Sequence, residues 1–248
     1  YHAGKKVELT RAGELLRNSA LTFKHDEIYL MRMLQDTAKN TRNFAFGATL
    51  SVAEFMLPPD LERLICAYPQ SHIRMEVGNT RELLSKLDAG ELDFAVVEGE
   101  FPREEYEFLL YRKEPYVPVA SRKKAEQYRN AEFRELLSER LILREPGSGT
   151  REILERELRR RGMTTDDFSQ ITELGNIGAI QAMLRANLGI SFFYQATLTD
   201  RETQLAPIEL KDFSLEHEVM FIFRKNSSFR EDYEEIYAFL TNRENSQN

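Results

Sequence analysis

Hydrophobic residues recur every seven positions near the start of the chain and predict one long helix. The repeat is formed by Leu9, Leu16, Phe23 and Leu30, with neighbouring positions filled by Ala20 and Leu34. Thr10 is placed to cap this helix, which we expect to run from about Arg11 to Lys39. A stripe this narrow favours pairing with a second helix, hence a dimer, over packing of the helix on its own domain.

The stretch 44–58 predicts a short strand that turns directly into a helix. Apolar residues alternate through Phe44 and Phe46, and the apolar residues that follow the turn have helical spacing. Thr49 and Ser51 stand at the turn as candidate N-cap hydroxyls. Such a junction directs backbone N–H groups and the positive end of a helix dipole out of the sheet, which suits a carboxylate, sulfate or phosphate.

A second junction of this kind follows about a hundred residues later. A buried strand at 141–143 runs into Gly-Ser-Gly-Thr-Arg at 147–151, and a charged helix comes next. A third strand-to-helix turn begins at Gly78, Asn79 and Thr80. Two junctions in two halves of the chain predict a small anion that is held between two lobes and sensed without chemical change.

The remaining pattern alternates strands with helices and predicts an α/β fold. Strands are expected at 73–77, 91–97, 106–111, 116–120, 171–174, 190–194 and 219–223, and helices at 80–89, 123–137, 151–161, 177–188 and 229–240. This alternation gives parallel βαβ units and a doubly wound sheet in each of two lobes. Pro115 and Pro118 mark an edge or a crossing between separate strands. Crossings near Ala120 and Leu215 would make a hinge that can close on a ligand.

Charge balance and cysteine content narrow the classes of function. The net charge of −7, from 34 basic and 41 acidic residues, disfavours nucleic-acid binding by this chain itself. Cys66 is the only cysteine and is expected in the core, which indicates a reducing compartment. The four histidines lack metal-ligand spacing, so neither a metal nor a cofactor is expected. No apolar run approaches the ~20 residues that span a bilayer.

Two stretches of the sequence resemble the LysR-type transcriptional regulators. The first is ELTRAGELL (8–16), followed by the long helix and FGATLSVAEFMLP (46–58); the second is GNTRELLSKLDAGELDFAVV (78–97). The resemblance covers nearly the whole chain. It implies a winged helix-turn-helix head, a dimerising linker helix and a two-lobed effector domain with the type II periplasmic-binding-protein fold.

On that resemblance the chain divides into a remnant of the wing (1–9), a linker helix (10–40), effector lobe I (41–120 and 216–248) and effector lobe II (121–215). The recognition helix would lie outside this chain. The implied partners are a small anionic metabolite, further copies of the chain in a homodimer or tetramer, promoter DNA through the head, and RNA polymerase as a further candidate. The identity of the effector, the regulated genes and the choice between activation and repression stay open.

Nine residues are candidates for contacting the effector, because they stand at or beside these junctions. They are Thr49, Ser51, Asn79, Thr80, Glu98, Ser148, Gly149, Thr150 and Asn176. The family places effector contacts at the first junction, and ligands of parallel sheets bind outside the carboxyl ends of the strands. Helix capping alone is the alternative for the hydroxyl and amide side chains. Arg144 and Arg151 lie nearby, and Arg151 can instead pair with Glu155 on the same helix.

Two other classes of function are considered. Glu98 and Glu100 follow a strand, and paired carboxylates can perform acid–base catalysis, but a solvated loop or a contact with an amine of the ligand is favoured and no enzyme is expected. A solute-binding protein of an importer shares the fold, yet it would need an export signal and has no use for the stripe from Leu9 to Leu30. The favoured interpretation is a cytoplasmic, ligand-gated transcriptional regulator.

Overall fold

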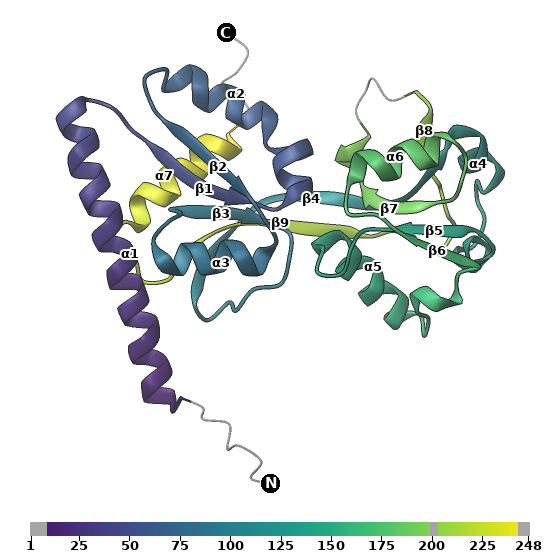
Figure 1. The fold of residues 1–248 in the computed structure, drawn as a ribbon, viewed down its shortest axis with the longest axis horizontal. Helices are drawn as coiled ribbons and strands as arrows, with labels where there is room; N and C mark the ends of the chain where they lie inside the picture. The colour runs from purple at the N-terminus through teal and green to yellow at the C-terminus, as the bar shows by residue number, and fades with distance from the viewer. Residues whose placement is uncertain (1–8, 199–202, 243–248) are drawn as a thin grey trace.

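Two lobes joined by a pair of long strands, with one long helix at the side, make up the molecule (Figure 1). The computed structural model describes residues 9–198 and 203–242. The wing remnant expected at 1–9 lies outside the described residues except for Leu9. Among the helices of 9–198 and 203–242, none combines the length and the apolar character that a membrane span requires.

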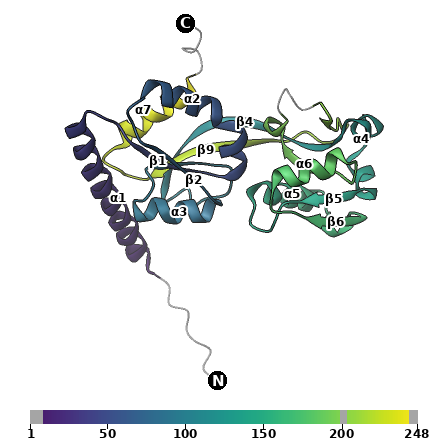
Figure 2. The same cartoon turned by 45° about the horizontal axis from the view of Figure 1, so that its top comes forward.

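The lobe beside helix α1 (Arg11–Lys39) is built on a sheet with the strand order β2-β1-β3-β9-β4. These strands are β2 (Ile73–Val77), β1 (Phe44–Ala48), β3 (Phe94–Val97), β9 (Glu216–Arg224) and β4 (Tyr106–Ser121). β1 runs parallel to β2 and β3, whereas β9 runs antiparallel to β3 and β4. Helices α2 (Pro58–Ala67) and α7 (Arg230–Thr241) cover one face and α3 (Thr80–Ala89) covers the other (Figures 1 and 2). Because both faces are covered, every residue of β1 is buried.

The second lobe is built on the far end of β4. There β4 pairs antiparallel with β7 (Ser191–Tyr194) and β8 (Leu205–Pro207). A parallel pair, β5 (Arg140–Leu143) and β6 (Gln170–Glu173), adjoins the start of β7 through a bridge between Leu141 and Ile190. Helices α5 (Gly149–Arg160) and α6 (Ile177–Arg185) pack beside these strands, with α4 (Arg122–Gln127) at the outer end (Figure 1). Each lobe thus combines parallel strand–helix units with antiparallel crossing strands.

One strand, β4, replaces the two short strands predicted at 106–111 and 116–120. It runs from Tyr106 to Ser121 and pairs with β9 as far as Pro115, so the two passages between the lobes lie side by side (Figure 2). The division into two strands was wrong, but the crossing expected at Pro115 and Pro118 is confirmed, since β4 leaves β9 after Pro115 and pairs with β7 from Tyr116. Pro118 stays in the sheet because its carbonyl group can still accept. The Ile208 amide donates to the Pro118 carbonyl at 2.8 Å.

Two smaller predictions were also wrong. The helix expected at 123–137 is α4 followed by a short 3-10 helix (Phe133–Ser138), and the break falls at Asn130, whose φ of 61° is left-handed. Cys66 is exposed on α2 rather than part of the core. Leu64 is buried on the packed face of α2, and Cys66, two positions later, therefore lies on a different, exposed face of the helix.

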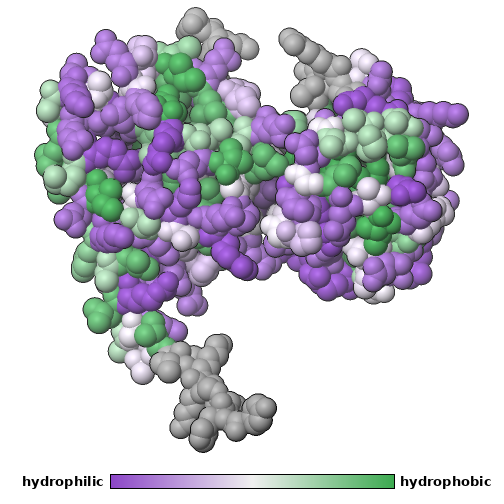
Figure 3. All heavy atoms as spheres, in the orientation of Figure 1, coloured by the Kyte–Doolittle hydropathy of each residue, from purple (hydrophilic) through white to green (hydrophobic). Residues whose placement is uncertain are grey.

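α1 packs on its own lobe with one face and leaves its apolar stripe exposed on the other. As predicted, Thr10 caps the helix by accepting from the Gly13 amide at 3.1 Å. On the packed face, Asp26 accepts from the Ser227 hydroxyl at 2.6 Å. The stripe has exposed fractions of 55, 72, 72 and 45% at Leu9, Leu16, Phe23 and Leu30. Figure 3 shows hydrophobic residues along the end of α1 that extends beyond the lobe.

Candidate functional site

A cavity of about 290 Å³ lies where strand-to-helix turns of the two lobes face each other. The first lobe lines it with the turns after β1 and β2, and the second lobe with the turn between β5 and α5 and with Gly175. Six of the predicted residues belong to this lining: Thr49, Asn79, Thr80, Glu98, Ser148 and Gly149. The two junctions singled out from the sequence therefore meet across one cavity.

A capping box fixes the turn before α3. The Asn79 side chain accepts from the Glu82 amide at 3.0 Å, and the Glu82 carboxylate accepts from the Asn79 amide at 3.1 Å. Gly99 packs against Thr80, and a β-carbon on Gly99 would lie 2.2 Å from Thr80 Oγ1. Only glycine fits this close approach, which holds Thr80 at the edge of the cavity.

Within the described residues, no side chain caps the turn before α5. Ser148 stands at the N-cap position, but its hydroxyl donates to Thr150 Oγ1 at 3.4 Å. Gly149 lies against Glu98, since a β-carbon on Gly149 would be 3.1 Å from Glu98 Oε1. The N-terminus of this 12-residue helix, with its positive dipole end, therefore opens onto the cavity.

Ser51 and Thr150 lie outside the cavity lining and bond to each other across the lobes. The two hydroxyl oxygens are 3.3 Å apart, and the Tyr116 hydroxyl donates to the Thr150 carbonyl at 2.7 Å. Both residues are buried. The expectation that Ser51 caps a helix was wrong, because Ser51 already has helical backbone angles, with φ −63° and ψ −36°. These two residues thus form a direct contact between the lobes.

Thr49 keeps a buried hydroxyl that bonds to no group of residues 9–198 and 203–242. The residue is 4% exposed, and its amide donates to the Val96 carbonyl at 3.2 Å. The expectation that this hydroxyl caps a helix was therefore wrong. A buried hydroxyl left without a partner costs on the order of 1–3 kcal/mol, which a bonding ligand would recover.

Glu98 is buried between the lobes, so the expectation of a solvated loop was wrong for this residue. It is 4% exposed, and its Oε2 atom has no hydrogen-bond partner in the described chain. Burial raises the pKa of this carboxyl to about 7, although the charge of Arg144 and a hydrogen bond with Tyr194 oppose the rise. Near neutral pH the group therefore exchanges between its charged and neutral forms. Glu100, in contrast, has a side chain that is 82% exposed.

Arg144, which the sequence placed only near the site, is the single cation among the described residues that line the cavity. It is buried and donates twice to the Glu145 carboxylate, at 2.7 Å each, which lowers the pKa of Glu145. Arg151 pairs with Glu155 at 2.7 Å, as the alternative interpretation had it, and with Glu173 at 2.7 Å. Both arginines flank the same turn, so no signal in the sequence distinguishes Arg144, which lines the cavity, from Arg151, which does not.

Asn176 caps α6 and lies outside the cavity lining. Its side chain accepts from the Ala179 amide at 2.9 Å, which is the capping alternative, and Gly175 lines the cavity in its place. In the part of the chain that the structure describes, no group of three or more His, Cys, Asp and Glu residues is arranged to hold a metal ion.

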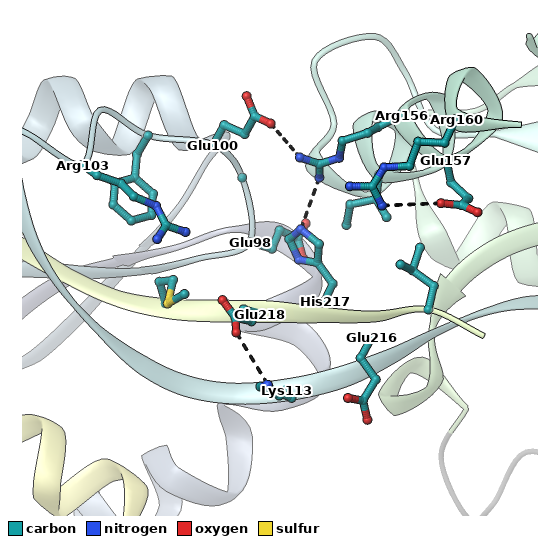
Figure 4. Close-up of a pocket in the computed structure, with 15 residues that line it drawn as sticks. Glu98, Glu100, Arg103, Lys113, Arg156, Glu157, Arg160, Glu216, His217 and Glu218 are labelled. Carbon is teal, nitrogen blue, oxygen red and sulfur yellow. Dashed lines mark hydrogen bonds and ion pairs between the residues drawn. The ribbon is translucent and has the colours of Figure 1, made fainter. Parts of the chain in front are cut away.

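A second cavity, of about 620 Å³, shares Glu98 with the first and lies between the loop after β3, α5 and the crossing strands (Figure 4). Arg156 bridges the lobes there, because its guanidinium donates to Glu100 at 2.6 Å and contacts His217 Nε2 at 3.3 Å. Burial and the Arg156 charge lower the pKa of His217 to about 4, so this ring is neutral at pH 7. Several charged groups of this cavity pair with one another: Lys113 with Glu218, Arg156 with Glu100, and Arg160 with Glu157.

Comparison with known proteins identifies the domain family of the chain. The family model described as LysR substrate binding domain matches residues 38–244. The chain is 25% identical over 204 residues to the HTH-type transcriptional regulator CysL of Bacillus subtilis (strain 168), which covers 79% of this chain and 64% of that protein. It therefore spans less than two thirds of the length of that relative.

Solved structures share the fold. The regulatory domain of CcmR from Synechocystis PCC6803, in complex with 2-PG, has a TM-score of 0.69 and 22% identity, covering 82% of this chain and 99% of that chain. The sulfate-bound regulatory domain of an OxyR2 mutant from Vibrio vulnificus has a TM-score of 0.69 and 19% identity, covering 81% of this chain and 95% of that chain. These likenesses confirm the predicted two-lobed α/β fold of the type II periplasmic-binding-protein kind.

Proposed function

Because the chain belongs to the family of LysR substrate-binding domains, we propose that it is the effector-binding part of a ligand-responsive transcriptional regulator, with a small anionic metabolite bound between its lobes. The observation that carries this proposal is the cavity onto which the uncapped N-terminus of α5 opens together with the buried hydroxyl of Thr49. Helix N-termini favour negative charge, and Arg144 adds a cation. The sulfate in the OxyR2 regulatory domain supports an anion in a domain of this fold.

The ligand would act on the balance between lobe arrangements, with 41–120 and 216–248 assigned to lobe I and 121–215 to lobe II. In the arrangement described here, Ser51 contacts Thr150 and Arg156 bonds to Glu100 across the lobes. A ligand shifts such a balance only by the difference between its affinities for the two arrangements. The paired strands β4 and β9 are the natural hinge.

The lobe arrangement would be passed on through α1 in a homodimer or tetramer. The helix is fixed to lobe I through its packed face, and its exposed stripe from Leu9 to Leu30 suits pairing with a second α1. Promoter DNA would be bound by a helix-turn-helix head, which the name of the CysL relative supports, with RNA polymerase as a further partner in the cytoplasm. The same stripe argues against a solute-binding protein, and no reaction on the ligand is proposed.

The test uses Thr49→Val with a panel of sulfate, phosphate and small hydroxy and keto acids. At least one anion is expected to raise the melting temperature of the unmodified chain. Thr49→Val is expected to weaken that binding by roughly tenfold, because it removes a hydroxyl donor. Without ligand its stability is expected to be unchanged or higher by about 1 kcal/mol, since the hydroxyl bonds to nothing in the described chain.

Thr37→Val is the matched control, because the Thr37 hydroxyl bonds to the Met33 carbonyl of α1, away from the cavity. Its anion binding is expected to equal that of the unmodified chain. The proposal is overturned if no small anion binds, or if Thr49→Val binds the effective anion as tightly as the unmodified chain does.

A further inference from the structure

Glu98 places a carboxylate in the same cavity onto which the N-terminus of α5 opens. It lines this cavity, and its buried Oε2 atom accepts from no group of residues 9–198 and 203–242. A buried carboxylate repels a second anion unless something compensates for the repulsion. An ionised carboxylate only accepts hydrogen bonds, so a proton on the ligand is the compensation that suits it.

Two hydrogen bonds direct the proton of the Tyr194 hydroxyl away from His217. The Arg156 guanidinium can only donate, so His217 Nε2 must accept at 3.3 Å, and the neutral ring carries its proton on Nδ1 (Figure 4). Nδ1 then donates to the Tyr194 oxygen at 3.1 Å. The Tyr194 proton is then available to Glu98, whose pKa Tyr194 lowers. The Oε2 atom of Glu98 accepts from no group of the described chain, so it stays an acceptor for a ligand.

We propose that Glu98 sets the ligand specificity of this cavity by accepting a hydrogen bond from the bound anion, so that oxyanions that still carry a proton, such as hydrogen phosphate, bind in preference to fully deprotonated ones, such as sulfate. The inference rests on the proposed function, because it takes the anion to lie in this cavity. Arg144 and the N-terminus of α5 offset part of the charge. A site built around a ligand's donor rejects the analogue that lacks it, because the buried acceptor is then left unpaired.

The other charged and titratable groups around Glu98 lie on four elements. Arg144 follows β5, Glu152 lies on α5, Tyr194 on β7 and Tyr116 on β4. Burial raises the pKa of both tyrosines, which therefore stay neutral near pH 7, and the arginine stays charged. Because the pKa of Glu98 is about 7, lowering the pH from about 8 to about 6 protonates its carboxyl. The protonated Oε2 can then donate to sulfate.

Isothermal titration calorimetry with phosphate and sulfate at about pH 8 tests the proposal. At that pH both ions are tetrahedral dianions, and they differ by one proton. The unmodified chain is expected to bind phosphate roughly tenfold more tightly than sulfate, or better. In Glu98→Gln, an NH2 group takes the place of one carboxylate oxygen, and this group can donate to the ligand. Sulfate is then expected to bind more tightly, and the ratio to fall below roughly threefold.

Glu100→Gln is the matched control, because its exposed carboxylate lies outside the lining of the first cavity. It is expected to keep the ratio of the unmodified chain. Sulfate binding to the unmodified chain should also tighten as the pH falls from about 8 to about 6, whereas Glu98→Gln should show no such change.

Three results would overturn the inference. They are equal affinities for phosphate and sulfate in the unmodified chain at about pH 8, an unchanged ratio in Glu98→Gln, and no binding of either ion to either protein. The last result leaves the proposed function standing if another small acid from the panel binds and depends on Thr49. A chain that binds no anion at all would overturn both.

Discussion

Burial, more than charge, decides what Glu98 does in the cavity. Arg144, whose charge lowers the pKa of Glu98, already shares two hydrogen bonds with Glu145, so it neutralises Glu98 only in part. Tyr194 supplies one hydrogen bond and cannot supply a second. The remaining desolvation penalty therefore favours the protonated form of the carboxyl, whose pKa rises to about 7.

This penalty predicts that Glu98→Gln stabilises the fold at high pH. The pKa of Glu98 is about 7 when folded, against an ordinary value of 4.5, so the folded chain binds more protons between these limits. Stability therefore falls as the pH rises through this window, and the full cost is present above about pH 7. At about pH 8 the variant is expected to gain up to about 3 kcal/mol in its free energy of unfolding. At about pH 5 the gain should drop below about 1 kcal/mol.

Urea unfolding of the unmodified chain and of Glu98→Gln at each pH measures the difference between their free energies of unfolding. A comparison of the two proteins is required because His217 changes the stability with pH in the opposite direction. Its pKa is lowered from 6.5 to about 4, so the folded chain binds fewer protons in that window and loses stability as the pH falls below 6.5. The two slopes partly cancel in the unmodified chain. A gain for Glu98→Gln that is the same at every pH would contradict the raised pKa of Glu98.

The strand-to-helix turns of the site could be predicted from the sequence, because their residues are neighbours in the chain. The contacts between the lobes could not be predicted. Thr49 and Gly149 follow strands and precede helices, and that pattern is local. The bond between Ser51 and Thr150 joins residues that lie far apart in the sequence, as does the burial of Glu98 against Gly149. Nothing near these residues in the chain signals such contacts. Their role in contacting an effector stays a prediction.

Among the helices and strands, α1 could be predicted from local signals in the sequence, whereas the full length of β4 could not. The bounds of α1 were predicted because the Thr10 cap and the seven-residue repeat are both local signals. The continuity of β4 was not, because it depends on pairing with β9, a strand about a hundred residues away. Pro115 is the last residue of β4 that pairs with β9, and Pro118 lies where β4 pairs with β7, yet neither proline ends the strand.

Pairing through the exposed stripe of α1 predicts that Phe23→Lys weakens self-association. Phe23 is 72% exposed and lies in the middle of the stripe, so a charge there would be buried against the partner helix. We expect the dissociation constant from sedimentation velocity to rise by roughly tenfold or more. Met31→Lys is the control, because Met31 is also exposed but lies outside the seven-residue repeat. An equal effect of both variants, or of neither, would contradict pairing through this stripe.

The packed face of α1 predicts a large cost for Asp26→Ala. The Asp26 carboxylate accepts from the Ser227 hydroxyl at 2.6 Å and from the Ser228 amide at 2.7 Å, and the substitution removes the acceptor for both. Stability at pH 7 is expected to fall by about 2 kcal/mol in denaturant unfolding. The neighbouring Glu27 is exposed, so Glu27→Ala is expected to change stability by less than about 0.5 kcal/mol. Equal costs for the two variants would argue that α1 is not fixed to its lobe in solution.

For the whole molecule, the question is how a ligand reaches a cavity that both lobes close. Its lining residues Thr49, Glu98 and Ser148 are all buried, and beside it Ser51 and Thr150 hold the lobes in contact. β4 and β9 are the paired strands that connect the lobes, so bending them can part the two turns. Ligand entry should then require the contact between Ser51 and Thr150 to open.

A disulfide between Ser51→Cys and Thr150→Cys, made with Cys66→Ser to remove the exposed native thiol, tests this requirement. The two hydroxyl oxygens are 3.3 Å apart, so sulfurs at these positions can meet with a small adjustment. In the oxidised chain we expect the association rate of the effective anion, measured by stopped flow, to fall by roughly tenfold or more. Reduction should restore it, which makes each sample its own control for changes in fold. If the oxidised and reduced chains bind at the same rate, the anion enters without parting the lobes, and lobe opening at this contact is not part of sensing.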